Sequence, residues 1–289
     1  MSEPQTPVWF ITGSSSGFGK HIALEALSRG HHVIATARDV SKISFLADKG
    51  AHTLALDVTS PLSQLQKIAK EANDIYGYIT HLVNAAGYIL IGAVEETTPE
   101  EDLAHFTTNV FGTLNTSKSL LPYLRATAGH RTITNFGSIA SWEGGAGAAL
   151  YCGSKFAVSG ISESMTKELA PLGIRVTVAE PGYFRTGILN QGTKVYSRET
   201  MEMYQKGEPG ELRRTLEVVD NRQPGDVGKG ARVLVDVLTK SGGAQGREVP
   251  IRVPLGSDCP EVIRRKIRET EEILREWEPI TTKTDHDDV

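Results

Sequence analysis

Apolar residues follow two alternating patterns along the chain. Short runs rich in Val, Ile, Leu and Thr have the length of a β-strand. The longer stretches between them repeat apolar positions every three or four residues, as one face of a helix does. This alternation predicts a doubly wound α/β fold, with a single parallel sheet of about seven strands and helices on both faces. The expected strands are Val8–Thr12, His32–Ala37, His52–Asp57, Ile79–Asn84, Arg131–Phe136, Arg175–Glu180 and Arg247–Arg252.

One helix start is marked by its own residues. Thr98 is placed to cap the helix, Pro99 takes the first helical position, and Glu101 stands three residues after the cap. This is the sequence of a capping box with proline at the first turn. We expect the helix to run to about Leu124.

The alternation is interrupted once, between the sixth and seventh expected strands. Residues 183–225 carry several charges, show no strand pattern and are weakly helical over Glu199–Asp220. Long insertions of this kind often cover active sites, so we predict a substrate lid here. A charged amphipathic helix is expected over Glu261–Trp277, ending before Pro279, and residues 280–289 are expected to form a flexible tail. No shift in composition marks a boundary, so residues 1–289 are predicted to form one domain.

Charge and composition narrow the classes of function. The 289 residues carry a formal net charge of −4, which gives no support for nucleic-acid binding. Cys152 and Cys259 are the only cysteines in the sequence, so no disulfide framework is implied and a reducing compartment fits. Neither a secretory signal nor a membrane-spanning run is recognisable. We expect a cytoplasmic protein that holds no metal.

The first expected strand leads into a glycine-rich loop and then a helix from about Lys20. Its three glycines would permit a tight turn, a close approach of the backbone to a pyrophosphate, and close packing of the helix on the strand. The N–H groups at the helix N-terminus would face the anion. A bare turn is the plainer interpretation, but a Rossmann-type dinucleotide site requires this strand–loop–helix context. We therefore predict cofactor contacts from Gly13, Ser15, Ser16, Gly17, Phe18 and Gly19.

The spacing Gly-x-x-x-Gly-x-Gly, with Asn84-Ala85-Ala86-Gly87 after the fourth strand, resembles the short-chain dehydrogenase/reductase family. The resemblance covers almost the whole chain, from Thr12 to about Asp285. It implies that Asp57, followed by Val58, contacts the adenine, and that the Asn-Ala-Ala-Gly turn supports the sheet beside the cofactor. It also implies that the turn after the sixth strand contacts the nicotinamide, although an ordinary Pro-Gly turn is the alternative. The residues concerned are Pro181, Gly182, Phe184 and Thr186.

Tyr151 and Lys155 are four residues apart at the start of an expected helix, so their side chains project from one face. A nearby ammonium lowers the pKa of a phenol, and such a phenol can exchange a proton with a carbonyl or alcohol oxygen. The resemblance adds Ser138 as a hydrogen-bond donor to the substrate oxygen, and Asn109 as the residue that holds a water in a proton relay to Lys155. Each of the four could singly be an ordinary surface or helix residue, but in this order they indicate a catalytic set.

The sequence also resembles one branch of the family, the retinol-dehydrogenase and 17β-hydroxysteroid-dehydrogenase-like group with microbial and fungal members. This similarity rests on Phe18, on the insertion at 183–225 and on Val253–Asp258. It implies a fairly apolar ketone, aldehyde or alcohol as substrate. Candidate pocket residues are Trp142, Leu150, Tyr183 and Leu189, each of which could equally be core or lid packing. Gly137 departs from the family pattern, because a Ser is common there, and the change could loosen the strand end.

Two other functions stay open on the sequence. One is a cofactor-binding regulator of the same fold without redox turnover, against which the intact catalytic set argues. The other is a biosynthetic isomerase or cyclase that uses the same pocket.

The end of the second strand bears on the choice of cofactor. NAD-selective sites place an acid there, whereas this chain has Ala37, which leaves room for a phosphate. Arg38 follows and can bind a 2′-phosphate bidentately. We therefore predict NADP(H). Asp39 could reach the ribose if the strand ended one residue later, and Arg38 could be only a solvated charge.

Two expected helices, over residues 99–124 and 150–172, have more apolar residues than one sheet-facing stripe needs. The resemblance implies that the matching helices pair across a twofold axis. We therefore expect a homodimer or a tetramer, although the C-terminal helix could cap that surface or the pocket instead.

Overall fold

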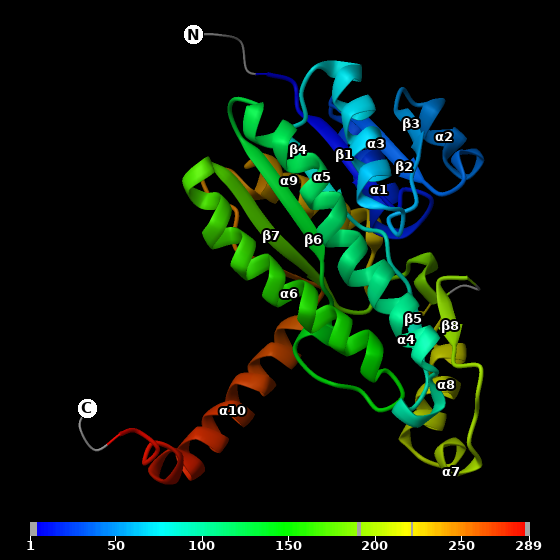
Figure 1. Ribbon diagram of the computed structural model, residues 1–289, viewed down its shortest axis with the longest axis vertical. Coiled ribbons are helices and arrows are strands. Elements are labelled where there is room, and N and C mark those ends of the chain that lie inside the picture. Colours follow the sequence, from blue (N-terminus) through cyan, green and yellow to red (C-terminus); the bar gives the residue numbers. More distant parts are fainter. Residues whose placement is uncertain (1–4, 190–191, 221, 287–289) are drawn as a thin grey trace.

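The computed structural model describes residues 5–189, 192–220 and 222–286. Seven parallel strands form the central sheet in the order β3-β2-β1-β4-β6-β7-β9 (Figure 1). The doubly wound α/β fold is therefore confirmed. The strands are β1 (Val8–Thr12), β2 (His32–Ala37), β3 (His52–Ala55), β4 (His81–Asn84), β6 (Arg131–Phe136), β7 (Ile174–Pro181) and β9 (Arg252–Leu255).

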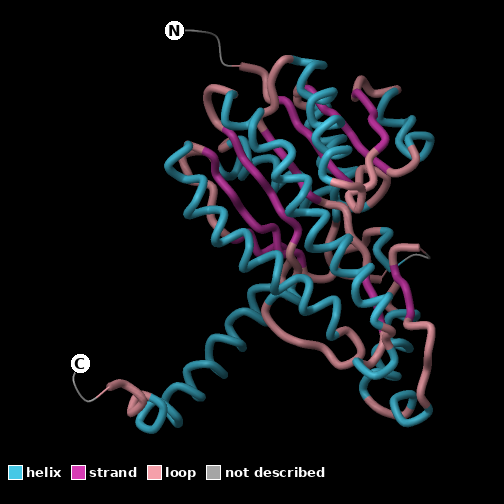
Figure 2. The backbone as a smooth tube through the Cα atoms, in the orientation of Figure 1, coloured by secondary structure: helices cyan, strands magenta, loops and turns pink. Residues whose placement is uncertain are grey.

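Helices cover both faces of the sheet, and alternate residues of β1 show why (Figure 2). Trp9 and Ile11 pack on one face, against α1 (Gly17–Ser28) and α9 (Val227–Thr239). Val8 and Phe10 pack on the other face. Because both faces of β1 are buried, its sequence is apolar from Val8 to Ile11, as expected for a central parallel strand. The helices on that second face are α3 (Leu62–Tyr76), α5 (Gly112–Ala126) and α6 (Ala149–Leu169).

The helix expected from Thr98 begins as its residues indicate and continues to Ala126, close to the expected end at Leu124, with one irregular turn. The Thr98 hydroxyl accepts from the Glu101 N–H at 3.3 Å, and the Glu101 carboxylate accepts from the Thr98 N–H at 3.0 Å. The helix α4 (Pro99–Phe106) then passes through one π-helical turn, Thr107–Phe111, before it continues as α5. Such turns are rare and often lie at functional sites.

The insertion contains a strand, which corrects the sequence prediction. Strand β8 (Lys194–Tyr196) pairs in parallel with β5 (Ile89–Ile91) outside the main sheet. A three-residue strand that alternates Lys-Val-Tyr is too short to stand out from sequence periodicity. The rest of the insertion includes two short helices, α7 (Glu202–Gln205) and α8 (Glu208–Val218), so the helical part of the expectation is confirmed.

Two boundaries near the C-terminus were also wrong. The last strand covers Arg252–Leu255 instead of Arg247–Arg252, because the edge of a sheet tolerates Pro254, a residue that weakens the strand pattern of this segment. The last helix, α10 (Cys259–Thr281), includes Pro279. A proline costs a helix one N–H bond, which is a small loss near its end. Residues 287–289 of the expected tail lie outside the described residues.

Within the part of the chain that the structure describes, no helix is both long enough and apolar enough to cross a membrane.

Candidate active site

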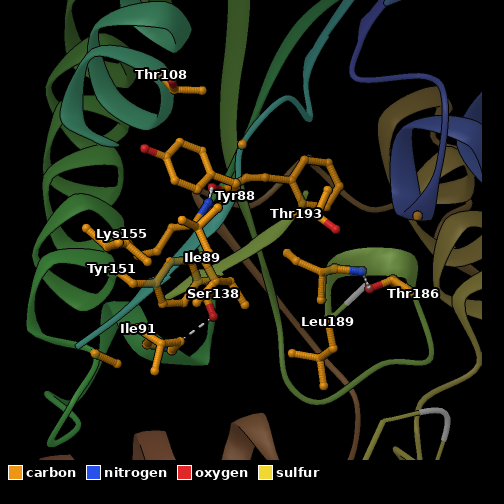
Figure 3. Close-up of a pocket in the computed structure, with 18 of the residues that line it drawn as sticks. Tyr88, Ile89, Ile91, Thr108, Ser138, Tyr151, Lys155, Thr186, Leu189 and Thr193 are labelled. Carbon is orange, nitrogen blue, oxygen red and sulfur yellow. Dashed lines mark hydrogen bonds between the residues drawn. The ribbon is translucent and has the colours of Figure 1, made fainter. Parts of the chain in front are cut away.

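A large cavity opens at the carboxyl ends of the sheet strands and has a volume of about 1160 Å³ (Figure 3). The strand order reverses between β1 and β4, and ligands of open α/β sheets bind beside this switch point. The cavity runs from the glycine-rich loop, past the turn after β4, to Ser138, Tyr151 and the turn after β7. Most of the predicted cofactor and catalytic residues therefore line one cavity.

The glycine-rich loop forms a cradle that side chains would fill. A Cβ atom on Gly13 would lie 2.9 Å from the Ala86 backbone, and the positive φ of Gly13 (+66°) also favours glycine. A Cβ on Gly19 would lie 2.5 Å from the Gly13 carbonyl oxygen. The helix α1 starts at Gly17, with neither a side-chain cap from Ser16 nor an acid in its first turn. Its first N–H groups and the positive end of its dipole are thus available to an anion.

Most of the other predicted cofactor residues line the same side of the cavity as the glycine-rich loop. Gly19 and Asn84 do not line the cavity, because Gly19 packs on Gly13 and the Asn84 amide donates to Ser117 and Asn135 at 2.9 and 2.8 Å. Asn84 therefore braces β4 against β6 and α5, the supporting position that the resemblance implies. The predicted residues that do line the cavity are Gly13, Ser15, Ser16, Gly17, Phe18, Arg38, Asp57, Val58, Ala85, Ala86, Gly87, Pro181, Gly182, Phe184 and Thr186.

A nicotinamide dinucleotide fits this wall. The glycine cradle and the uncapped start of α1 suit a pyrophosphate. A ring contact also joins the start of α1 to the turn after β7, since the Phe18 and Phe184 centroids lie 5.1 Å apart. Ala37 and Arg38 lie at the end where the adenine ribose would bind, beside Asp57. The catalytic set lies at the other end, where a nicotinamide would bind.

Helix α6 presents Tyr151 and Lys155 to the cavity, opposite Ser138 at the end of β6 (Figure 3). The Lys155 Nζ atom donates to the Phe136 carbonyl at 2.8 Å and lies 5.6 Å from the centroid of the Tyr151 ring. Ser138 Oγ accepts from the Ala140 N–H at 3.1 Å. This bond uses one acceptor site of the hydroxyl, so Ser138 can still donate its proton, and the Tyr151 oxygen lies within its reach.

The pKa of Tyr151 corrects one expectation. Desolvation raises the pKa of Tyr151 to about 12, and the nearby Ser138 hydroxyl opposes the shift. Desolvation also lowers the pKa of Lys155 to about 8. Desolvation is therefore the main cause for both groups, and Lys155 is not among the causes that shift the pKa of Tyr151. At neutral pH Tyr151 is a phenol, which is the form that donates a proton.

Asn109 lies in the π-helical turn and does not line the cavity. Its Oδ1 accepts from the Tyr88 N–H at 3.1 Å, and its Nδ2 donates to the Tyr88 carbonyl at 2.9 Å and to Ser154 Oγ at 3.3 Å. The same amide lies 3.2 Å from Nε2 of the buried His105. Asn109 therefore holds Tyr88, a cavity residue that directly follows the Asn-Ala-Ala-Gly turn and that sequence reasoning missed.

Gly137 does not loosen the strand end. A Cβ there would lie 2.9 Å from Ser141 Oγ and from the Val178 side chain. Ser141 Oγ accepts from the Ser138 N–H at 3.2 Å and donates to the Lys155 carbonyl at 3.0 Å. Ser141 therefore occupies the space next to Gly137 and joins the segments that carry Ser138 and Lys155.

Two of the four candidate pocket residues are placed elsewhere. Tyr183 and Leu189 line the cavity, whereas Trp142 and Leu150 do not. The Trp142 indole N–H donates to the buried carboxylate of Glu180 at 2.9 Å, and the Arg252 guanidinium lies 4.6 Å from the ring centroid. This polar cluster holds Trp142 away from the cavity. Apolar wall residues that sequence reasoning did not single out are Ile89, Ile91, Ile188, Val195, Leu212 and Leu216.

A buried ion pair attaches the insertion to the body. Arg213 on α8 donates to Glu96 at 2.8 Å, and Glu96 is fully buried. Burial alone would raise the pKa of Glu96, but bonds from the Met201 and Ala93 N–H groups, together with Arg213, bring it below the usual value. The charged pair therefore attaches α8 to the turn Val94–Glu96 after β5, and the Met201 N–H attaches the start of α7 to the same carboxylate.

The chain matches the family described as "short chain dehydrogenase" over residues 7–196. It is 35% identical over 269 residues to "Oxidoreductase calM" of Penicillium decumbens, covering 90% of this chain and 87% of the relative. It is 34% identical over 189 residues to retinol dehydrogenase 5 of Mus musculus, covering 63% of this chain and 58% of that protein.

Solved structures show the same architecture. A short-chain dehydrogenase from Streptomyces avermitilis superposes with a TM-score of 0.87 at 33% identity, covering 98% of this chain and all of the other. Two Burkholderia proteins with the same fold were solved with different cofactors. One, from Burkholderia phymatum in complex with NAD, has a TM-score of 0.77 at 20% identity over 94% of this chain and 96% of its own. The other, from Burkholderia cenocepacia in complex with NADP, has a TM-score of 0.71 at 23% identity. The match covers 94% of this chain and 97% of the other.

Proposed function

Because the chain belongs to the short-chain dehydrogenase family, in which a nicotinamide cofactor is bound, we propose that it is an NADP(H)-dependent oxidoreductase that interconverts an apolar ketone or aldehyde with the corresponding alcohol. One observation carries the proposal: Ser138, Tyr151 and Lys155 line the same cavity as the glycine cradle and Arg38. A bound nicotinamide supplies or accepts the hydride. The residues of the chain then have to orient the carbonyl and move one proton.

Each catalytic side chain has a role that fits its environment. Ser138 donates a hydrogen bond to the carbonyl oxygen, which remains open to it because the bond from the Ala140 N–H uses an acceptor site and not the hydroxyl proton. Tyr151 is a phenol at neutral pH and donates its proton to that oxygen as negative charge develops. Lys155 keeps a positive charge near the ring and is fixed by the Phe136 carbonyl. Asn109 keeps Tyr88 in the wall of the cavity.

The cavity wall supports an apolar substrate. The side chains of β5, β8 and α8 that face the cavity are largely aliphatic, and burying apolar substrate surface against them favours binding by about 25 cal/mol per Å². The retinol dehydrogenase relative is consistent with this class of substrate.

A cofactor-linked screen tests the proposal. We expect oxidation of NADPH with at least one medium-sized apolar ketone or aldehyde, and little turnover with short polar carbonyls, because only the former fill the aliphatic wall. Nicotinamide absorbance gives the rate, and each substrate is run with NADPH and with NADH. If cofactor binds but no carbonyl or alcohol is turned over by the wild type, a non-redox role replaces this one.

We further propose that residues 183–225 act as a substrate lid on a single catalytic domain. The insertion supplies Leu189, Val195, Leu212 and Leu216 to the cavity wall, so its position decides whether the substrate is enclosed. The buried Glu96–Arg213 pair is the contact on which that position depends most, since removing one partner strands a buried charge.

Arg213→Ala should loosen the lid without unfolding the sheet. It leaves the Glu96 carboxylate buried and unpaired, a local cost of about 3–5 kcal/mol, so limited proteolysis should cut within 192–220 much faster than in wild type. Arg214→Ala is the matched control, because Arg214 is exposed and donates to the Gln205 carbonyl. Equal cutting of the two variants would show that the ion pair does not fix the segment.

We also propose a cytoplasmic homo-oligomer. Exposed apolar side chains on α4, the following turn and α6 support the surface that the family resemblance implies, namely Leu103, Phe111 and Phe156.

A further inference from the structure

The helix α10 stands apart from the rest of the molecule. Its first turns contact β9 and the short turn Ile139–Ser141, and the remainder extends away from the body (Figures 1 and 2). Of its 23 residues, Cys259 alone is buried. A helix of this length is about 34 Å long, so most of it lies in contact with no other element of the described chain.

One face of α10 is nevertheless strongly apolar. The positions on this face are separated alternately by four and three residues. This is the heptad spacing of helices that pack side by side in coiled coils. Ile267, Leu274 and Trp277 are 48%, 55% and 51% exposed. Exposed apolar residues in such a stripe, and not scattered singly, indicate a surface that another element covers. The residues at this heptad spacing are Ile263, Ile267, Thr270, Leu274, Trp277 and Thr281, and Ile273 and Ile280 lie beside them.

The charges of α10 identify what covers the stripe. Residues 261–268 contain four basic residues and one acid, whereas residues 269–278 contain five acids and one basic residue. A second copy of the helix in antiparallel orientation places the basic half against the acidic half at both ends. A parallel pair would place like charges together, and an anionic membrane surface would repel the acidic half.

We propose that α10 pairs with α10 of a second copy of this chain as an antiparallel two-helix interface, with a twofold axis that crosses the seam at the level of residue 272 along the helix. This register places Ile267 of each copy in the layer of Trp277 of the other, and Thr270 in the layer of Leu274. At the flank, Arg264 of each copy faces Glu278 of its partner. A twofold axis makes every contact occur twice, as in any isologous dimer.

The pairing has a consequence for the cavity. Val262 and Arg265, in the first turns of α10, line the cavity. In an antiparallel pair, the far end of the partner helix reaches these first turns. The second copy therefore lies beside this part of the cavity wall, and this surface is distinct from the one on α4 and α6.

Cysteine cross-linking tests the register directly on the full-length protein. In the double variant Ile267→Cys/Trp277→Cys, the two new thiols of one copy are ten residues apart, about 15 Å along the helix, so they cannot join within a chain. Mild oxidation should give a covalent dimer on a non-reducing gel. Arg268→Cys/Glu276→Cys is the matched control: these positions lie on the opposite face, so it should form no covalent dimer and should run as a monomer on the same gel. The native Cys152 and Cys259 are buried in both proteins.

Charge exchange gives a second, independent measurement. Arg264→Glu and Glu278→Arg should each weaken self-association on the order of tenfold, because two attractive flanking pairs become repulsive. Mixing the two single variants should restore association, since the introduced glutamate of one chain then faces the introduced arginine of the other. Sedimentation velocity measures both effects. The proposal would be overturned if no covalent dimer formed or if the control cross-linked equally well. It would also be overturned if the mixed variants failed to associate, or if α10 bound phosphatidylcholine vesicles instead.

Discussion

Tyr151→Phe should lower the turnover number for carbonyl reduction by two to four orders of magnitude while the protein still binds NADPH. The change removes one hydroxyl and keeps the ring, so the cavity wall is preserved. That hydroxyl is the proton donor in the proposed mechanism, and a positioned general acid contributes about 10²–10⁴-fold. Stopped-flow measurement of a single turnover separates this loss from any effect on product release, and fluorescence titration reports cofactor binding.

Tyr88→Phe is the control for this experiment. Tyr88 also lines the cavity, and the Asn109 side chain holds it by its backbone and not by its hydroxyl. Loss of the Tyr88 hydroxyl should leave the turnover number within a few-fold of the wild-type value. A Tyr151→Phe enzyme that reduces carbonyls at near wild-type rates would remove Tyr151 from the mechanism.

The pH dependence of the reverse reaction follows from the same group. Alcohol oxidation needs Tyr151 as a base, and its pKa lies at about 12 in this structure. The basic form therefore increases as pH rises, so wild-type oxidation should increase with pH across the range in which the fold survives, and Tyr151→Phe should lose this dependence.

Much of the sheet could be predicted because its central strands are buried on both faces. Such strands appear in the sequence as short apolar runs. The bounds of β1, β2 and β6 match the ends of these runs. The edge strand β9 could not be placed in this way, since it contains Pro254 and has a neighbour on one side only. Strand β8 is set by its pairing with β5, a contact between residues about one hundred positions apart that local periodicity does not contain.

The proposed catalytic residues could be singled out from the sequence because Tyr151 and Lys155 are four residues apart and share a helix face, with Ser138 shortly before them after β6. Trp142 was placed wrongly for the opposite reason. Its position depends on the buried Glu180 of β7 and on Arg252 of β9, and no sequence pattern joins these three residues. The pKa of Tyr151 was also misjudged, since spacing shows that a lysine is near but not how strongly both groups are desolvated.

The geometry at the end of β2 supports a preference for NADP(H) over NAD(H). Ala37 and Arg38 line the cavity. The Asp39 carboxylate, which could have bound a ribose, accepts instead from the Ser41 N–H and hydroxyl at 3.0 and 2.6 Å. Ser14 is fully buried and its hydroxyl donates to the Ile11 carbonyl, so it cannot help to bind a phosphate. The 2′-phosphate then depends mainly on Arg38.

Arg38→Ala should therefore weaken NADPH binding by at least tenfold and NADH binding little, because a hydrogen bond to a charged group contributes about 1.5–3 kcal/mol. Ala37→Asp should shift preference towards NADH, since the carboxylate repels a phosphate and can bond a 2′-hydroxyl. Asp39→Asn is the matched control: its side chain lies next in sequence but caps the following turn, so the ratio of the two affinities should stay at the wild-type value. Titration of each variant with both cofactors measures that ratio. A wild type that prefers NADH, or an Arg38→Ala variant that loses both cofactors equally, would show that Arg38 does not select the phosphate and that the open space beside Ala37 is not a phosphate site.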